Sequence, residues 1–152
     1  MAIVFKSEHF LVVAPEKPHI SRIDGGHLVI APKEAVEDRT QLPPKQAIEL
    51  MKLTMVVGEA MRTVLAKKGI DLGRINYQDN GNWTPTLHIH LYGRAKGATV
   101  QKYGTPLMFP ATHEEFSAEP TLETFQPDEI EAIAKEVTRL LATEKYRSFQ
   151  IR

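Results

Sequence analysis

The sequence contains no cysteine among its 152 residues, which excludes disulfides, thiolate chemistry and any zinc site that needs sulfur. It also lacks an apolar run of about 18 residues, so we expect no transmembrane helix and no membrane partner. Its first residues carry no charged leader followed by a long apolar stretch, so we expect no secretory signal. A cytoplasmic location is the resulting prediction.

Net charge is absent as well, because 19 lysines and arginines balance 19 aspartates and glutamates. A chain without net charge has no global field to gather a polyanion, which argues against a dedicated nucleic-acid binder. Local donors can still hold a small phosphate ligand. With 42% apolar and 25% charged residues, the composition is that of an ordinary globular protein. The length suits a single domain that buries a sizeable core.

The distribution of apolar residues, proline and glycine predicts an α+β fold with an antiparallel sheet. Strands are expected at 10–14 and 27–31, joined by a loop of about a dozen residues, with a third strand within 70–78. Pro44 opens the longest helix, whose apolar residues recur at helical spacing until Lys67-Lys68-Gly69 closes it. A last helix begins at Pro127 with acidic residues in its first turn. Between these elements we expect a helical turn plus loop at 33–41, a short strand within a loop at 100–111, and a surface connection at 113–126.

The stretch from Asn76 to Arg94 is the most informative part of the chain. Its second half alternates between Thr86, His88, His90 and Tyr92 on one parity and Leu87, Ile89 and Leu91 on the other. This period of two predicts a strand with one aliphatic face and one histidine face. Residues two apart on a strand lie about 6–7 Å from each other on the same side, so both imidazoles can act on one small ligand. The preceding Asp79-Asn80-Gly81-Asn82 has the composition of a turn.

Taken alone, the histidine pair leaves three interpretations open. The two imidazoles could be catalytic, could form half of a metal site, or could be structural residues with satisfied hydrogen bonds. The remaining histidines, His9, His19 and His113, are expected at the surface.

Two segments together resemble the histidine triad (HIT) family, whose signature is three histidines alternating with apolar residues and followed by two apolar residues. The first is the histidine strand with its upstream Asn76-Tyr77 and Gly81-Asn82 and its downstream Gly93-Arg94. The second is Gly26-His27-Leu28-Val29-Ile30-Ala31-Pro32-Lys33, which is similar to the Gly-His-apolar-Pro-Lys segment of that family. The resemblance covers about residues 10–94. It implies one HIT-like domain over 1–152, with the motif-bearing core at about 10–94 and a C-terminal extension at 95–152.

The alignment places His88 at the middle, nucleophilic histidine and His90 at the last one, so that Thr86 stands where the family has its first histidine. The alternative register makes His88 the first histidine, His90 the nucleophile and Tyr92 the substitute for the last. We prefer the former, because the pattern from Pro85 to Arg94 then fits without a gap.

The resemblance implies a nucleotide hydrolase or nucleotidyl transferase that attacks the α-phosphate of a nucleotide conjugate through a covalent nucleotidyl-histidine intermediate. The conjugate would be a dinucleoside polyphosphate or a nucleoside phosphoramidate. His88 would be the nucleophile, with His90 and His27 bonding phosphate or leaving-group oxygens. Because one nitrogen of His88 attacks, we expect the other to be fixed by a hydrogen bond to a backbone carbonyl. The residues expected at the nucleotide or its phosphate are Asn82, Asn76, Thr86 and Arg94.

The family resemblance also implies a nucleotide partner, no cofactor, no resident metal and a homodimer. Two rival functions stay open beside the enzyme. One is a catalytically weak nucleotide-binding module of the same fold, since Thr86 replaces a histidine. The other is a metal-dependent enzyme in which His27, His88 and His90 bind a divalent ion, although no carboxylate stands near the pair as in many zinc ligand sets.

Overall fold

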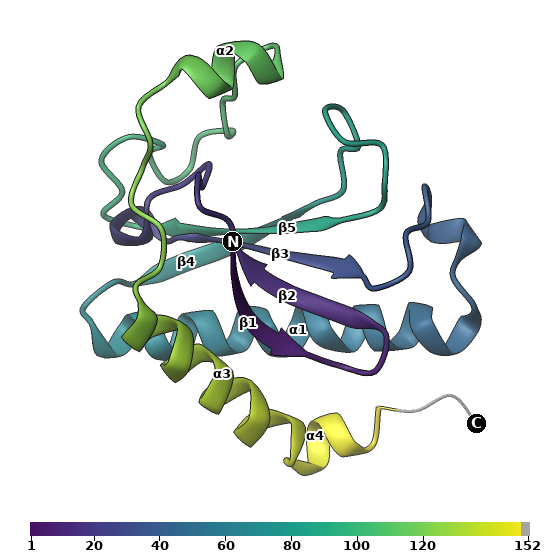
Figure 1. Cartoon of the computed structure of the whole chain (residues 1–152). Helices are drawn as coiled ribbons and strands as arrows, with labels where there is room; N and C mark the ends of the chain where they lie inside the picture. Colours follow the sequence, from purple (N-terminus) through teal and green to yellow (C-terminus); the bar gives the residue numbers. More distant parts are fainter. Residues whose placement is uncertain (150–152) are drawn as a thin grey trace.

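The computed structural model describes residues 1–149 as a five-stranded antiparallel sheet with helices on both of its sides (Figure 1). The strands are β1 (Ala2–Lys6), β2 (Phe10–Ala14), β3 (His27–Pro32), β4 (Leu72–Gln78) and β5 (Ile89–Ala95). The helices are α1 (Pro44–Lys67), α2 (His113–Ala118), α3 (Pro127–Leu141) and α4 (Glu144–Arg147), with 3-10 turns η1 (Arg22–Asp24) and η2 (Arg39–Gln41). The α+β fold with an antiparallel sheet, a long helix and a C-terminal helix is therefore confirmed.

The strand order β1-β2-β3-β5-β4 places the histidine strand β5 beside β3, in the interior of the sheet. Val12, Leu28 and Leu91 point to one face, and all three are fully buried against the core that α1 completes. The other face carries the opposite parity of each strand, because successive side chains of a strand point to opposite sides. Figure 1 shows α1 and α2 on opposite sides of the sheet. The histidine face is thus the α2 side.

Helix α1 has the bounds that the sequence predicts. Pro44 occupies its first turn, where a missing N–H breaks no helical bond, and Gly69 beyond its end takes a φ of +80°. Helix α3 packs on α1 and touches β1, and its buried Ile133 and Val137 join the same core. Among the helices within residues 1–149, none is long and apolar enough to cross a membrane.

The structure corrects three details of the predicted topology. β1 at residues 2–6 is a strand that we did not expect, and it pairs with β2 although Val4 is its only buried residue. Residues 100–111 form no strand, because Gln101 folds the loop by bonding both backbone groups of Met108. The expected surface connection contains α2, which a capping box at Thr112 and Glu115 begins.

Two glycines allow the loop before β3 to approach β5 closely. Gly25 has a φ of +129°, and a Cβ atom added to Gly93 would lie 1.9 Å from the carbonyl oxygen of Gly25. A hydrogen bond holds the two segments together, because the Gly93 N–H donates to the Gly26 carbonyl at 2.9 Å. Only residues without a side chain permit this approach. It brings His27, the next residue, directly opposite Tyr92.

Candidate active site

The register of β3, β5 and β4 gathers the polar residues of the site on one face. His27 lies opposite Tyr92, and Val29 lies opposite His90. Residues directly opposite on antiparallel strands share a face, so His27, His90 and Tyr92 point to the α2 side together. His88 comes just before β5 begins at Ile89, and its ring lies 4.7 Å from the His90 ring in an edge-on arrangement. The predicted pairing of His88 and His90 on one side is therefore confirmed.

The ring of His88 is held by the main chain two residues earlier. Its Nδ1 donates to the carbonyl oxygen of Thr86 at 2.6 Å, which is the backbone acceptor that we expected. With the proton on Nδ1, a neutral imidazole has its lone pair on Nε2. The imidazole that carries this lone pair lies in the wall of a cavity of about 390 Å³.

His27 and His90 form a hydrogen-bonded pair with defined proton positions. The backbone N–H of His19 donates to His27 Nδ1 at 3.2 Å, so the proton of neutral His27 resides on Nε2. That Nε2–H donates to His90 Nδ1 at 2.8 Å, which leaves the proton of neutral His90 on its own Nε2. His27 is 2% exposed and both of its nitrogens are occupied, whereas His90 lines the cavity.

His19 belongs to this cluster, and our prediction that it lies at the surface is wrong. Its ring is partly buried and stacks on His27 at 4.7 Å, and its Nδ1 is 2.7 Å from the hydroxyl of Tyr92. Phe109 and Phe116 pack against its outer side. No spacing in the sequence links position 19 to the histidine strand, because a loop of irregular backbone carries it there. His9, which we also expected at the surface, is partly buried with its Nδ1 2.6 Å from a carboxylate oxygen of Glu49 in α1, whereas His113 is exposed as expected.

Burial keeps the imidazoles of His19, His27 and His90 neutral. It lowers the pKa of His90 to about 3, assisted by the charges of His88 and His19. Burial likewise lowers the pKa of His19 to about 4, with a smaller contribution from His88. The pKa of His27 falls well below its ordinary value, first through burial and then through the other imidazoles. Burial also raises the pKa of Tyr92, so its hydroxyl keeps its proton.

The cavity beside His88 and His90, which we call the histidine pocket, is closed by a turn and by aromatic rings. Asn80 to Thr84 form one wall, which includes Asn82, the residue that we expect at the phosphate. Trp83 stacks on Phe116 at 5.4 Å, which ties this turn to α2. Lysine, arginine, aspartate and glutamate are all absent from the pocket lining within residues 1–149. The pocket therefore offers hydrogen-bonding side chains and π faces.

Asn76 and Arg94 lie outside the histidine pocket and bond to each other. Arg94 Nη1 donates to Asn76 Oδ1 at 2.7 Å, and its Nη2 donates to the carbonyls of Lys102 and Thr105 at 3.1 and 2.7 Å. Arg94 is 6% exposed, so this guanidinium fastens the loop after β5 to the sheet. The structure thus separates these two expected phosphate contacts from the histidines. Thr86 contributes its carbonyl to His88 and lines a smaller hollow beside it.

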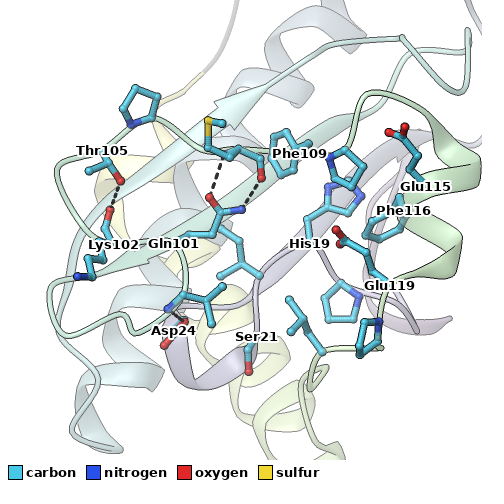
Figure 2. A pocket seen from close by; sticks show the side chains of 18 residues that line it. His19, Ser21, Asp24, Gln101, Lys102, Thr105, Phe109, Glu115, Phe116 and Glu119 are labelled. Carbon is cyan, nitrogen blue, oxygen red and sulfur yellow. Dashed lines mark hydrogen bonds between the residues drawn. The ribbon is translucent and has the colours of Figure 1, made fainter.

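A larger cavity of about 1000 Å³ adjoins the histidine pocket (Figure 2). We call it the outer cavity; residues 18–24 of the β2–β3 loop and residues 100–122 after β5 enclose it. Figure 2 shows His19, Phe109 and Phe116 together on one side of it and Lys102 and Thr105 on the other. His19, Phe109, Pro110 and Phe116 line both cavities. Sequence reasoning did not find this space, because its walls come from two loops far apart in the chain.

Ring nitrogens of His19, His27 and His90 lie within 4.8 Å of one another, a spacing that a metal ion can bridge. The hydrogen bonds oppose such a site. Metal binding needs a free lone pair, but His27 accepts a backbone N–H on Nδ1 and carries its proton on Nε2. An ion would have to displace the bond from His27 to His90. A second group consists of Glu8 and His9 of the β1–β2 turn and Glu49 of α1.

Comparison with known proteins identifies the domain. The sequence model of the HIT domain family matches residues 2–97, and no curated protein matches the chain. A histidine triad protein from Sinorhizobium meliloti has a TM-score of 0.63 at 16% identity, over 91% of this chain and 87% of that one. One from Bradyrhizobium japonicum has a TM-score of 0.61 at 18% identity, over 89% of both chains. A zinc-bound histidine triad family protein from Mycobacterium smegmatis has a TM-score of 0.60 at 17% identity, over 91% and 84%.

Proposed function

We propose, because this chain belongs to the HIT domain family, that it is a nucleotide hydrolase or nucleotidyl transferase acting at the α-phosphate of a nucleotide conjugate. Family membership supports a nucleotide-binding, hydrolase-type function in general. The observation that carries the specific proposal is His88, whose Nδ1 is fixed on the Thr86 carbonyl while its ring lines the pocket. Fixing one nitrogen presents the other as a nucleophile.

The proposed reaction has two displacements. First, the lone pair of His88 Nε2 forms a bond to phosphorus, and the bond from phosphorus to the leaving group breaks. The leaving atom keeps that electron pair and takes a proton from solvent. Second, a water oxygen bonds phosphorus, the phosphorus–Nε2 bond breaks and its electron pair returns to the nitrogen, while the water's proton goes to solvent. Overall one water is consumed. Both steps develop charge on the same phosphate oxygens, so one set of donors stabilises both.

In this proposal His90 is the donor to phosphate and His27 is a positioning residue. His90 lines the pocket with its proton on Nε2, because Nδ1 accepts from His27. His27 is buried with both nitrogens bonded, so it acts on the substrate only through His90. This replaces the direct phosphate contact that we expected for His27. The arrangement also favours His88 over His90 as the nucleophile, since the outward nitrogen of His90 carries a proton.

The nucleoside would lie on the apolar part of the histidine face. Val29 shares that face with His90, and cross-strand pairing adds Val13 and Leu11 of β2 and Ala31 of β3. These side chains make this part of the face apolar, which suits a planar base. Asn82 remains our candidate for a side-chain amide bonded to phosphate. We also propose a homodimer, which sedimentation velocity would test by giving the mass of two chains.

The test is covalent labelling of His88. The wild type, His88→Ala, His90→Ala and the distant control His9→Gln are incubated with diadenosine tetraphosphate or an adenosine 5′-phosphoramidate, and intact masses and product nucleotides are followed without an acid quench. We expect a nucleotidyl mass increment and turnover in the wild type and control, and neither in His88→Ala, which should still bind AMP.

Two results would contradict this assignment. Full activity in His88→Ala with loss in His90→Ala would place the nucleophile at His90. AMP binding without adduct or product in any variant would favour the binding-module alternative. A parallel incubation with a chelator tests metal dependence, because one structural neighbour is described as zinc-bound. The proposal expects the activity to be unchanged by the chelator.

A further inference from the structure

We propose that a further cavity, at the edge strand β4, is a binding site for a phosphate group (Figure 1). This cavity has a volume of about 670 Å³ and is formed by residues 74–78 of β4, Arg94 of β5 and residues 103–107 of the following loop. We call it the β4 pocket. It shares no lining residue with the histidine pocket, so this inference does not depend on the proposed function.

Two arginine side chains come together in the β4 pocket. Arg74 of β4 lies directly opposite Arg94 of β5. Residues opposite each other on antiparallel strands share a face, with their Cβ atoms about 5 Å apart. Like charges in such a pair repel each other and destabilise the sheet. An anion beside both guanidinium groups would offset this repulsion.

Neither arginine has a carboxylate partner within residues 1–149. Arg94 is 6% exposed, and its guanidinium donates only to the amide oxygen of Asn76 and to two backbone carbonyls, which are all neutral. Its Nε is buried and has no acceptor in that part of the chain. Arg74 is exposed, and its side chain forms no hydrogen bond or ion pair with the described residues. Because aspartate and glutamate are also absent from the described lining, the protein supplies two positive charges here and no negative one.

Neutral hydrogen-bond donors line the same cavity. Because arginine only donates, the bond from Arg94 Nη1 at 2.7 Å fixes Asn76 Oδ1 as an acceptor and leaves the Asn76 amino group as a donor. Asn76 is two residues from Arg74 on β4, so both side chains point to the same face. Tyr103 brings a hydroxyl group from the loop, and its ring packs over Gly73, where a Cβ atom would lie 2.5 Å from it. A guanidinium, an amide amino group and a phenol therefore line one cavity.

The charge of this site matches a phosphate group better than a carboxylate. A phosphate monoester carries about 1.5–2 negative charges at pH 7 and three oxygens that accept hydrogen bonds. A carboxylate carries one charge on two oxygens. Arg74 can bind a phosphate through two parallel hydrogen bonds, since its guanidinium is exposed. Arg94 attracts the same anion through its charge, because its N–H groups are bonded or buried.

The arginine end of the β4 pocket is separate from the histidines. Arg94 lies four residues beyond His90, which corresponds to about 13 Å along the strand. Tyr92 lies between them on the same face, and its ring stacks on that of His90 at 5.2 Å. A single phosphate group bound at Arg74 therefore cannot contact His88 at the same time. The β4 pocket is an anion site in addition to the histidine pocket.

The test is a titration of the full chain with inorganic phosphate at pH 7, followed by proton–nitrogen correlation NMR. We expect the Asn76 side-chain amide and the backbone N–H groups of Gly104 and Thr105 to shift, with a dissociation constant of about 1 mM. The indole N–H of Trp83 reports separately on the histidine pocket. Acetate, with one charge, should bind about tenfold more weakly at the β4 pocket. Equal binding of acetate and phosphate there would overturn the choice of phosphate.

Variants of Arg74 identify the residue that binds the anion. Arg74→Gln should weaken phosphate binding at the Asn76 signal by about tenfold, and folding is not at risk because the side chain is exposed and unbonded within residues 1–149. Arg74→Lys should lose about threefold, since it keeps the charge without the planar fork. Lys6→Gln is the matched control, because it removes one exposed charge from β1 at the opposite edge of the sheet. Equal weakening in Arg74→Gln and Lys6→Gln would overturn the assignment to Arg74.

AMP and adenosine distinguish free phosphate from a phosphate carried by a nucleotide. Equal dissociation constants for phosphate and AMP at the Asn76 and Gly104 signals would support the free ion as the ligand. Tighter binding of AMP at the same signals would support a nucleotide phosphate. Adenosine has no phosphate and should leave both signals unmoved. If adenosine shifted them as AMP does, the inference would be overturned.

Two further outcomes would overturn the site. One is that phosphate at about 20 mM, twenty times the expected dissociation constant, moves no signal of the β4 pocket. The other is that phosphate fails to bind while Arg74→Gln sediments with the mass of one chain and the wild type with that of two, which would pair Arg74 with a carboxylate of a second copy. Neither result bears on the adduct at His88. Conversely, absence of adduct and turnover would remove the proposed function and leave the titration of the β4 pocket valid.

Discussion

Acid should destabilise this protein through its buried histidines, and His19 allows the effect to be isolated. An unfolded histidine has a pKa of about 6.5. In the folded protein, burial lowers the pKa of His19 to about 4 and that of His90 to about 3, and lowers the pKa of His27 as well. Below pH 6.5 the unfolded chain therefore binds protons that the folded chain does not, and the free energy of unfolding falls as the pH falls. The loss levels off only near the folded pKa values.

The size of the effect follows from proton linkage. A histidine that stays neutral when folded reduces the free energy of unfolding by about 2 kcal/mol between pH 7 and pH 5. His19 is partly open to solvent, so we count it at about half, or about 1 kcal/mol. With His27 and His90 the cluster accounts for about 5 kcal/mol. That is comparable to the whole stability of many domains, so the protein should approach unfolding near pH 5.

Urea denaturation at pH 7 and pH 5 measures this directly. His19→Asn keeps a side-chain amide near the Tyr92 hydroxyl but cannot titrate, and it keeps the backbone N–H that His27 accepts. It should lose about 1 kcal/mol less than wild type over this interval. His113→Asn, at an exposed position, should lose as much as wild type. Equal losses in His19→Asn and wild type, or a wild-type loss below about 1 kcal/mol, would refute the neutral cluster.

Three further predictions concern the backbone around the site. Thr86→Ala should keep kcat within about threefold of wild type, because His88 bonds the carbonyl and not the side chain of residue 86; a tenfold slower single turnover would contradict this. Gly93→Ala should lower the free energy of unfolding by about 3 kcal/mol, since its Cβ would lie 1.9 Å from the Gly25 oxygen; an unchanged melting temperature would exclude the close approach. Arg94→Ala should lower the free energy of unfolding by about 3 kcal/mol and expose residues 102–105 to limited proteolysis, because the buried guanidinium donates to two carbonyls there. A cleavage pattern like that of wild type would show that other contacts hold the loop.

The sequence predicts best where local signals agree with each other. Pro44 and Gly69 bracket a helix whose apolar spacing fills the interval, and the structure has α1 from Pro44 to Lys67. The period of two at the histidine strand likewise places His90 on the face opposite Leu91, because the pleat of a strand leaves no other choice. Such features depend on residues within one or two turns of each other.

Features that depend on loop geometry were not predictable in the same way. His19 reaches the cluster through an irregular loop, whose course is fixed by the close approach of Gly25 to Gly93. Arg94 reads as a phosphate ligand from its place after the histidines, but its partners lie 8 and 11 residues further along in a loop without periodicity. The outer cavity forms only where the loops at residues 18–24 and 100–122 come together. The spacing of residues in the sequence carries no information about contacts between loops that lie far apart in the chain.

Two of the three bonds that set the proton positions of the site involve the main chain: the Thr86 carbonyl for His88 and the His19 N–H for His27. A point mutation changes the side chain, but every amino acid keeps a backbone carbonyl, and every one except proline keeps a backbone N–H. Substitutions at positions 19 and 86 can therefore occur without changing the tautomers of His27 and His88. Proline at position 19 is the single substitution that this arrangement forbids by chemistry alone, and a census of natural variants should find that residue missing there.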